Sequence, residues 1–278
     1  MEQLQRRVKM VELKNFFAEK QRENIVNFIK EYFVDHGGPN TKAVIGISGG
    51  KDSTIAAALL CEALGPEKVI GVLMPKGIQN DIKDSIKVCE ILGIKYYNIN
   101  IESAYLALCH SIDEEYDYDH CCSDNSSIAT NLPARLRMST LYSIASLVGG
   151  RVCHTGNKSE MYIGYTTKYG DLAGDFSLFK NYTASEVIAI GETFKEIPYE
   201  LIHKAPGDGM SGKSDEDNLG FTYEELDNYI LHSKISNVDT CRKIQERNQM
   251  SRHKSIINFP APMRPKFDEN GEDEYFRW

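Results

Sequence analysis

Short apolar runs alternate with amphipathic stretches through the first part of the chain. Residues 43–47, 69–73 and 94–101 are mainly apolar and are bounded by polar residues, as expected for strands buried on both faces. Between them, residues 54–64 and 82–92 have apolar positions at helical spacing, and a glycine follows each stretch. Strands that alternate with helices in this way predict βαβ units, and therefore a parallel sheet with right-handed crossovers.

The remaining pattern predicts more helices and one more strand. Residues 128–148 predict a long helix, although Pro133 leaves the position of its start open. Further elements are expected as helices at 11–33, 158–163, 183–194, 222–231 and 238–250, a strand at 151–154, and loops at 169–175 and 205–219. We therefore predict one α/β domain over 1–278, a Rossmann-like doubly wound parallel sheet with N-terminal helices (about 1–38) and a C-terminal helical extension (about 220–278). Such sheets bind ligands beyond the carboxyl ends of their strands.

Composition narrows the class of protein. The chain has 278 residues, of which 41% are apolar, and a formal charge of −8, which fits a soluble globular protein. No apolar run approaches the ~20 residues of a membrane span, and the charged N-terminus lacks the apolar core of a signal peptide, so we expect a cytoplasmic location and no membrane partner. The acidic balance argues against a nucleic acid partner. Seven irregularly spaced cysteines are expected to be thiols, and Cys109, His110 and 120–122 lack zinc-site spacing.

The most informative motif joins the first predicted strand to its helix. It consists of Gly46, Ile47, Ser48, Gly49, Gly50, Lys51, Asp52 and Ser53. A glycine-rich turn lets backbone amides approach an anion, and the helix that follows directs its positive N-terminus at the same point. The spacing fits neither a Walker A loop nor a dinucleotide-binding loop. Since carboxylates hold Mg²⁺ beside phosphates, Asp52 suits a metal-bound polyphosphate.

This loop and three later segments resemble one enzyme family. The sequence S-G-G-K-D-S at 48–53 resembles the S-G-G-x-D-S pyrophosphate loop of ATP pyrophosphatases. The segments 131–138, 153–160 and 164–171 resemble, in this order, the A-R-x-R-M, T-G-N-x-S-E and T-K-Y-G-D motifs of the NAD synthetase family, ammonia-dependent type. The resemblance covers residues 43–254 and implies an adenine nucleotide alpha hydrolase-like fold.

The same resemblance implies a reaction. ATP-dependent amidation would convert deamido-NAD to NAD with ammonia, through an NAD-adenylate intermediate, and release AMP and pyrophosphate. Two alternatives stay open. One is another ATP pyrophosphatase, such as a GMP synthetase-like amidase or a tRNA-modifying thiolase, and the other is a nucleotide sensor without catalytic activity.

The resemblance also implies roles for single residues. Residues 46–53 and Thr155 contact ATP, Asp52 and Glu160 hold Mg²⁺, and deamido-NAD is contacted by Arg135, Lys168, Asp175, His253 and Lys254. Asp171 and Asp175 lie in the segment where the family receives ammonia. A carboxylate there can hold ammonium and accept its proton, and we favour Asp171 for this role.

Two positions depart from the family pattern. Ala184 stands where many relatives have a lysine that contacts ATP, with Lys180 as a candidate substitute, and Gly207 stands where many have a hydroxyl residue, with Ser211 nearby.

The resemblance implies a homodimer with residues 128–148 at its interface and deamido-NAD bound across the subunits. Because fewer than 45 residues precede the first predicted strand, we expect free ammonia or a separate glutaminase, rather than a fused amidase domain, to supply nitrogen.

Overall fold

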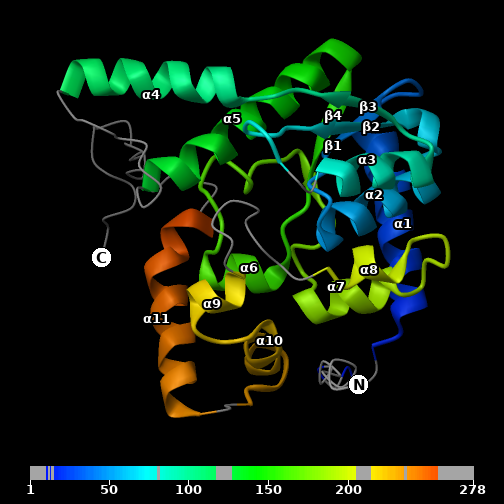
Figure 1. Ribbon diagram of the computed structural model, residues 1–278. Coiled ribbons are helices and arrows are strands. Elements are labelled where there is room, and N and C mark those ends of the chain that lie inside the picture. The colour runs from blue at the N-terminus through cyan, green and yellow to red at the C-terminus, as the bar shows by residue number, and fades with distance from the viewer. Residues whose placement is uncertain are drawn as a thin grey trace, which may run out of the picture.

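A parallel sheet with helices on both faces forms the centre of the molecule (Figure 1). The computed structural model describes residues 11, 13, 16–79, 82–116, 127–204, 214–234 and 237–255. Within these residues the strands are β1 (Lys42–Gly46), β2 (Val69–Leu73), β3 (Lys95–Asn98), β4 (Gly150–His154) and β5 (Phe176–Ser177). They lie in the order β3-β2-β1-β4-β5, and each neighbouring pair is parallel.

The strand order reverses between β1 and β4. The chain first builds β1, β2 and β3 outward, and then returns to the other side of β1 to form β4 and β5. Val44 therefore pairs with Ile70 on one side and with Val152 on the other. In open parallel sheets, the loops that leave two such strands diverge and form a crevice beyond the carboxyl edge. The reversal brings the loops that follow β1 and β4 next to each other.

Both faces of β1 are covered by helices. Ile45 packs into a large apolar cluster with residues of α1 (Ala18–Asp35), α2 (Lys51–Leu64), α3 (Ile82–Leu92) and α7 (Ala184–Gly191). Val44 packs on the opposite face with Val152 and with Ala145 of α5 (Ser127–Val148). Neither Val44 nor Ile45 has exposed surface, which explains why the apolar run at 43–47 is continuous rather than alternating.

A second, smaller core borders the carboxyl edge of the sheet. It is centred on the buried Leu226 and includes Ile163, which ends the helix that follows β4. The helices around it are α6 (Lys158–Ile163), α9 (Asp215–Leu219), α10 (Tyr223–His232) and α11 (Val238–Ser255). The remaining elements are α4 (Glu102–Tyr116), which packs against α5, α8 (Tyr199–Ile202) and a 3-10 turn at Pro66–Lys68.

The predicted Rossmann-like parallel sheet is confirmed, with differences at several elements. Helix α5 begins at Ser127 and contains Pro133, so the proline does not delay its start. The loop expected at 205–219 is wrong for Asp215–Leu219, because Ser214 and Asp217 form a reciprocal cap that starts α9. Helix α4 and strand β5 were not predicted. The expectations for the N-terminal residues 1–10, the segment 120–122, Gly207, Ser211 and the tail beyond 255 lie outside the described residues.

Two further expectations can be compared with the described part of the chain. None of its helices has both the length and the apolar character that a membrane crossing requires. Cys61, Cys89, Cys153 and Cys241 are free thiols, but Cys109 on α4 is disulfide-bonded. The expectation of free thiols is therefore wrong for Cys109.

Candidate active site

The glycine-rich loop leaves β1 and turns directly into α2. The amide of Ile47 donates to the carbonyl of Val72 at 3.0 Å, so the loop stays attached to the sheet beyond the end of β1. Gly49 has a φ of +75°, and a Cβ added there would lie only 3.0 Å from the Cβ of Asp84. Both the backbone angle and the close packing therefore require glycine at this position.

Hydroxyl groups hold the loop in its turn. The amide of Gly50 donates to Ser48 Oγ at 3.2 Å, Ser48 Oγ lies 3.1 Å from Ser53 Oγ, and Thr54 Oγ1 donates to the carbonyl of Gly50 at 2.8 Å. Gly50 is the residue before the first turn of α2. Since the first amides of a helix lack partners within that helix, this arrangement presents a fixed anion site.

The loop after β4 joins this site through Asn157. Asn157 begins α6 with a reciprocal cap, in which its Oδ1 accepts from the amide of Glu160 at 3.1 Å and Glu160 Oε2 accepts from the amide of Asn157 at 3.0 Å. Asn157 Nδ2 also donates to Asp52 Oδ1 at 3.3 Å. One asparagine thus connects the two carboxylates that the sequence predicted as metal ligands. Thr155, the predicted ATP contact, lies two residues earlier in the same loop.

The cluster of Asp52 and Glu160 is electrostatically strained. Burial raises the pKa of Glu160 to about 8, and the nearby charge of Asp52 adds to this rise, while Lys51 opposes it. Lys51 Nζ lies 2.6 Å from Asp52 Oδ2. Burial lowers the pKa of Lys51, but the charges of Asp52 and Glu160 outweigh burial and hold that pKa above its usual value. Such a cluster favours an additional cation.

Asp52 and Glu160 fit a magnesium ion together with phosphate oxygens. In the described residues, no group of three or more His, Cys, Asp or Glu side chains is arranged to hold a metal. Mg²⁺ is usually held by one or two carboxylates, water and the phosphates of a substrate, which matches a two-carboxylate site beside an anion-binding loop. The donor set therefore suits a metal that arrives with a nucleotide.

A second group of predicted residues surrounds the segment after α6. Arg135 of α5 donates through Nε to the carbonyl of Lys168 at 3.2 Å. Lys254 of α11 donates through Nζ to the carbonyls of Gly164 and Thr166, both at 2.8 Å. His253 is exposed, and its Nδ1 contacts the carbonyl of Met250. The structure therefore gathers the predicted substrate contacts Arg135, Lys168 and Lys254 beside one segment.

Asp171 belongs to this second group. Its Oδ1 accepts from the amide of Thr167 at 2.5 Å. Asp171 is an exposed residue, but the protein atoms around its carboxyl partly remove that group from water and raise its pKa; backbone amides, first that of Thr167, and Lys254 oppose this rise. Asp171 also acts on the pKa of Glu160, so the two groups of residues are neighbours.

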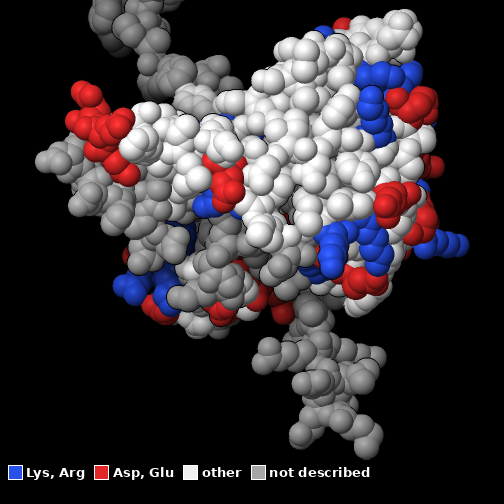
Figure 2. Space-filling view, turned by 45° about the horizontal axis from the view of Figure 1, so that its top comes forward, with Lys and Arg blue, Asp and Glu red and all other residues white. Residues whose placement is uncertain are grey.

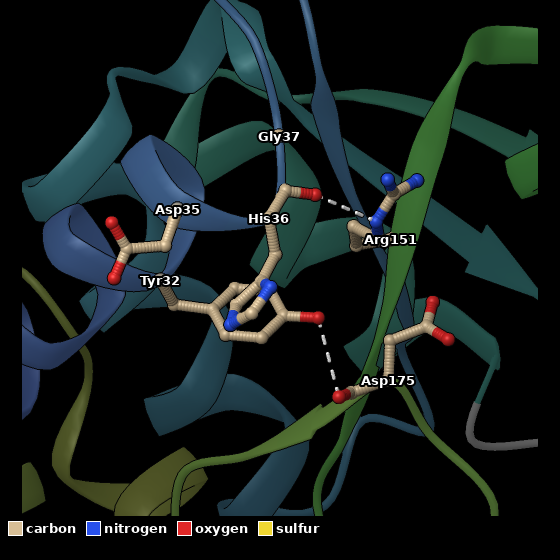
Figure 3. A pocket seen from close by; sticks show the side chains of 6 residues that line it. All are labelled: Tyr32, Asp35, His36, Gly37, Arg151 and Asp175. Carbon is tan, nitrogen blue, oxygen red and sulfur yellow. Dashed lines mark hydrogen bonds between the residues drawn. The ribbon is translucent and has the colours of Figure 1, made fainter.

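Asp175 lies apart from both groups, in a cavity of about 640 Å³ (Figure 3). Its Oδ2 accepts from the amide of Val152 at 2.7 Å, and its carbonyl accepts from Tyr32 Oη at 3.2 Å. Arg151 of β4, the end of α1 and His36, which directly follows α1, form the other walls. Because Arg151 is near the start of β4, this cavity is displaced from the carboxyl edge, where Asp52 and Glu160 lie.

The two candidate lysine positions also differ in their surroundings. Ala184 is buried at the start of α7, where its amide donates to Ser159 Oγ at 3.0 Å. Lys180 is exposed, and it lies close enough to His154 to affect its pKa. Burial, followed by Lys180, lowers the pKa of His154 to about 4. Its Nδ1 contacts Ser177 Oγ at 2.8 Å. Because its pKa is low, the His154 side chain at the end of β4 is neutral at neutral pH.

Sequence reasoning missed two residues that organise the site. Asn157 could have been found, because asparagine three residues before glutamate is a capping signal. Asp227 of α10 could not, because an aspartate on an amphipathic helix usually lies at the surface. It is fully buried and accepts from Ser159 Oγ and from the amide and hydroxyl of Ser185, the latter two at 2.8 and 2.6 Å. Asp227 therefore ties α6, α7 and α10 together beside Lys51.

Comparison with known proteins identifies the family of the chain. The model of the family described as NAD synthase matches residues 21–258. The chain belongs to the NAD synthase family. The NH3-dependent NAD+ synthetase of Pyrococcus furiosus is 34% identical over 263 residues, which are 90% of this chain and 96% of that protein.

Two solved structures share the fold over most of their length. The NMN synthetase of Francisella tularensis matches with a TM-score of 0.79 and 30% identity, over 89% of this chain and 99% of that one. The NH3-dependent NAD synthetase of Campylobacter jejuni matches with a TM-score of 0.68 and 28% identity, also over 89% and 99%. The resemblance implied by the motifs is therefore confirmed at the level of the family.

Proposed function

We propose that the protein is a ligase that amidates deamido-NAD to NAD with ammonia, and that it converts ATP to AMP and pyrophosphate. The observation that carries this proposal is a contact at the strand reversal of an NAD synthase family fold. Asp52 of the anion-binding loop at 46–53 accepts a hydrogen bond from Asn157, whose amide donates to Glu160. A GMP synthetase-like amidase, a thiolase or a sensor would need only the loop. The family match over 21–258 favours the ligase over these alternatives.

The phosphates of ATP would lie at the N-terminus of α2. Backbone amides of the loop and of the first helical turn neutralise phosphate charge, and Thr155 contacts ATP from the loop after β4. Asp52 and Glu160 would hold Mg²⁺, which supplies charge neutralisation to the phosphates when bound. Lys180 is the candidate for the lysine that is absent at position 184.

The reaction needs no protein nucleophile. The nicotinate carboxylate attacks the α-phosphate of ATP and pyrophosphate leaves, after which ammonia attacks the NAD-adenylate and AMP leaves. The task of the protein is to position the reactants and to neutralise charge. The predicted contacts with deamido-NAD are Arg135, Lys168, Asp175, His253 and Lys254. Asp171, an exposed residue whose pKa is raised because its carboxyl is partly removed from water, would hold ammonium and accept its proton.

The proposed assembly is a homodimer formed through α5, with deamido-NAD bound across the subunits. Figure 2 shows few charged side chains in the middle of the face over α4 and α5, in contrast to the margins. Leu106 and Leu108 of α4 and Leu147 of α5 are exposed. A face with few charges and with exposed leucines supports an interface there.

Two expectations about the setting of the reaction remain proposals. Nitrogen would come from free ammonia or from a separate glutaminase. The cytoplasm is the proposed location, since the substrates are metabolites.

The direct test of the proposal is a product assay. Purified protein with ATP, Mg²⁺, ammonium and deamido-NAD is expected to form NAD, AMP and pyrophosphate, as measured by chromatography. A parallel reaction contains nicotinate mononucleotide in place of deamido-NAD, because a matching structure is an NMN synthetase. A clear preference for nicotinate mononucleotide would correct the substrate, and formation of ADP, or of no amide with either substrate, would contradict the proposal.

A further inference from the structure

Lys51 is the residue of the phosphate loop with the most unexpected surroundings. Its side chain is only 6% exposed, although lysine is rarely buried unless it is paired. Nζ donates to Asp52 Oδ2 at 2.6 Å, and the ring of Tyr223 lies 5.9 Å away. The sequence suggested that this lysine contacts ATP. In the structure, its partner is instead a carboxylate that the proposed function gives to the metal.

Both carboxylate oxygens of Asp52 are already engaged. Oδ1 accepts from Asn157 Nδ2 at 3.3 Å, and Oδ2 accepts from Lys51 Nζ at 2.6 Å. The Asp52 side chain is 18% exposed, so a cation can reach it only over a small area. A metal ion that binds Asp52 through Oδ2 must therefore share that oxygen with the ammonium group or displace it, and one that binds through Oδ1 still meets the repulsion of the nearby ammonium charge.

Lys51 has other negative charges nearby. Glu160 and Asp227 both act on it electrostatically. Asp227 is fixed in place by the amide and hydroxyl of Ser185 and by Ser159. Burial raises the pKa of Asp227, while these hydrogen bonds and the charge of Lys51 oppose that rise, so the carboxyl group stays near Lys51 whatever happens at Asp52. The ammonium can consequently leave Asp52 without losing every negative neighbour.

We propose that Lys51 is the resident counter-cation of this cluster, which occupies Asp52 in the metal-free protein and is displaced toward Asp227 when a divalent cation binds. This inference rests on the proposed function, because it takes Asp52 as a metal ligand. Lys51 is then a positioning residue that keeps two half-buried carboxylates compatible with the fold until the metal and nucleotide arrive. It also lowers the affinity for the metal alone, so that metal binding depends on the phosphates.

The test compares metal binding without nucleotide in the wild type and in Lys51→Met. Mg²⁺ is titrated alone while the unfolding temperature is followed, and Mn²⁺ binding is measured by electron paramagnetic resonance. Lys51→Met is expected to bind either metal about tenfold more tightly, the size expected when a charged hydrogen bond no longer competes. Without metal, the variant is expected to unfold at a lower temperature than wild type, and added Mg²⁺ is expected to restore the difference.

Lys204→Met is the matched control. Lys204 Nζ also lies 2.6 Å from a carboxylate, that of Asp84, whose Cβ packs against Gly49 of the loop. The control removes one positive charge near the loop without releasing Asp52, and it should bind the metals as wild type does. If Lys51→Met fails to fold, Lys51→Gln, which keeps a hydrogen-bond donor without the charge, replaces it.

Several outcomes would overturn the inference. Unchanged or weaker metal binding in the Lys51 variant, with a raised KM for ATP, would make Lys51 a phosphate ligand. An equal gain in the Lys204 variant would reduce the effect to general charge. Absence of metal binding in all proteins would also overturn it, and NAD formation by the same wild-type preparation would show that the proposed function stands independently.

Discussion

The carboxylates predicted to take part in catalysis lie in two differently built regions. Asp52 and Glu160 directly follow the reversal of the sheet, are joined by Asn157, and share the buried Lys51. Asp171 and Asp175 lie at separate points of the segment between α6 and β5, are exposed, and each accept a hydrogen bond from a backbone amide. The first region is fixed by two strands and largely excludes water, whereas the second is accessible to it.

This difference in access to water indicates that the two regions act in different steps of the reaction. Reactions of polyphosphates are accelerated by fixed backbone amides and by charges held away from water, because electrostatic interactions with the phosphates are stronger where water is excluded. Ammonium arrives from solvent and must lose a proton, which requires an accessible carboxylate. Asp52 and Glu160 should therefore affect a different step from Asp171 and Asp175, and the following predictions test that separation.

The largest effect is expected for Asp52→Asn. Removal of this charge should lower kcat for NAD formation about a thousandfold, because neutralisation of the phosphates loses a ligand. The assay is NAD formation at saturating substrates. Asp239→Asn, on the exposed surface of α11, is the matched control and should retain full activity. Activity within tenfold of wild type for Asp52→Asn would remove Asp52 from the phosphate region.

The titration of His154 tests whether water is excluded from the end of β4. Its pKa of about 4 lies below the value of ~6.5 in the unfolded chain. As pH falls from 6.5 to 4, the unfolded state binds a proton first, so folding stability should fall by about 3 kcal/mol over this range. Denaturant unfolding at several pH values measures this loss, which His154→Gln should remove.

The exposed His110 provides the control for that experiment. His110→Gln, at a side chain that is 75% exposed, should leave the acid-induced loss of stability as in wild type. If His154→Gln also leaves the loss unchanged, the histidine titrates as it would in water, and the contrast between the two regions disappears.

Asp171→Asn should have a smaller effect that is confined to ammonia. We expect the KM for ammonium to rise about tenfold, because one carboxylate that attracts the cation and accepts its proton is lost. The KM for ATP should stay unchanged. Initial rates at varied ammonium and varied ATP separate the two constants, and equal changes in both would show that Asp171 supports the fold of the site instead.

The smallest effect is expected for Asp175→Asn. Asparagine can still accept the bond from the amide of Val152, so only the charge beside the cavity is lost. The KM for deamido-NAD should rise about threefold at unchanged kcat, the size of an exposed polar contact. A large loss of kcat would bring Asp175 into the catalytic region and contradict its placement away from the carboxyl edge.

The sequence predicted the sheet and the phosphate loop well, because both depend on local patterns. Continuous apolar runs indicated buried strands, and the glycines of the segment 46–50 indicated a tight turn. The contact between Asp52 and Asn157, which are 105 residues apart, required the strand order, which no local pattern contains. For the same reason the sequence could not separate Asp175 from Asp171, although they are four residues apart.

Other features depended on long-range packing. From its position in the loop, Lys51 was expected to contact phosphate. The packing of α10 against α6 and α7 is what buries it and brings it close to carboxylates. The missed helix α9 has a different cause. Its few apolar residues hid it, and the reciprocal cap of Ser214 and Asp217 was overlooked.

The division between the two regions can be tested most directly by pyrophosphate release in the absence of ammonium. Wild-type protein mixed with ATP, Mg²⁺ and deamido-NAD should release pyrophosphate in a rapid phase and then stop, since the NAD-adenylate has no acceptor. Asp52→Asn should lose this phase, whereas Asp171→Asn should keep it and be slow only after ammonium is added. Loss of the rapid phase in both variants, or in neither, would contradict the account.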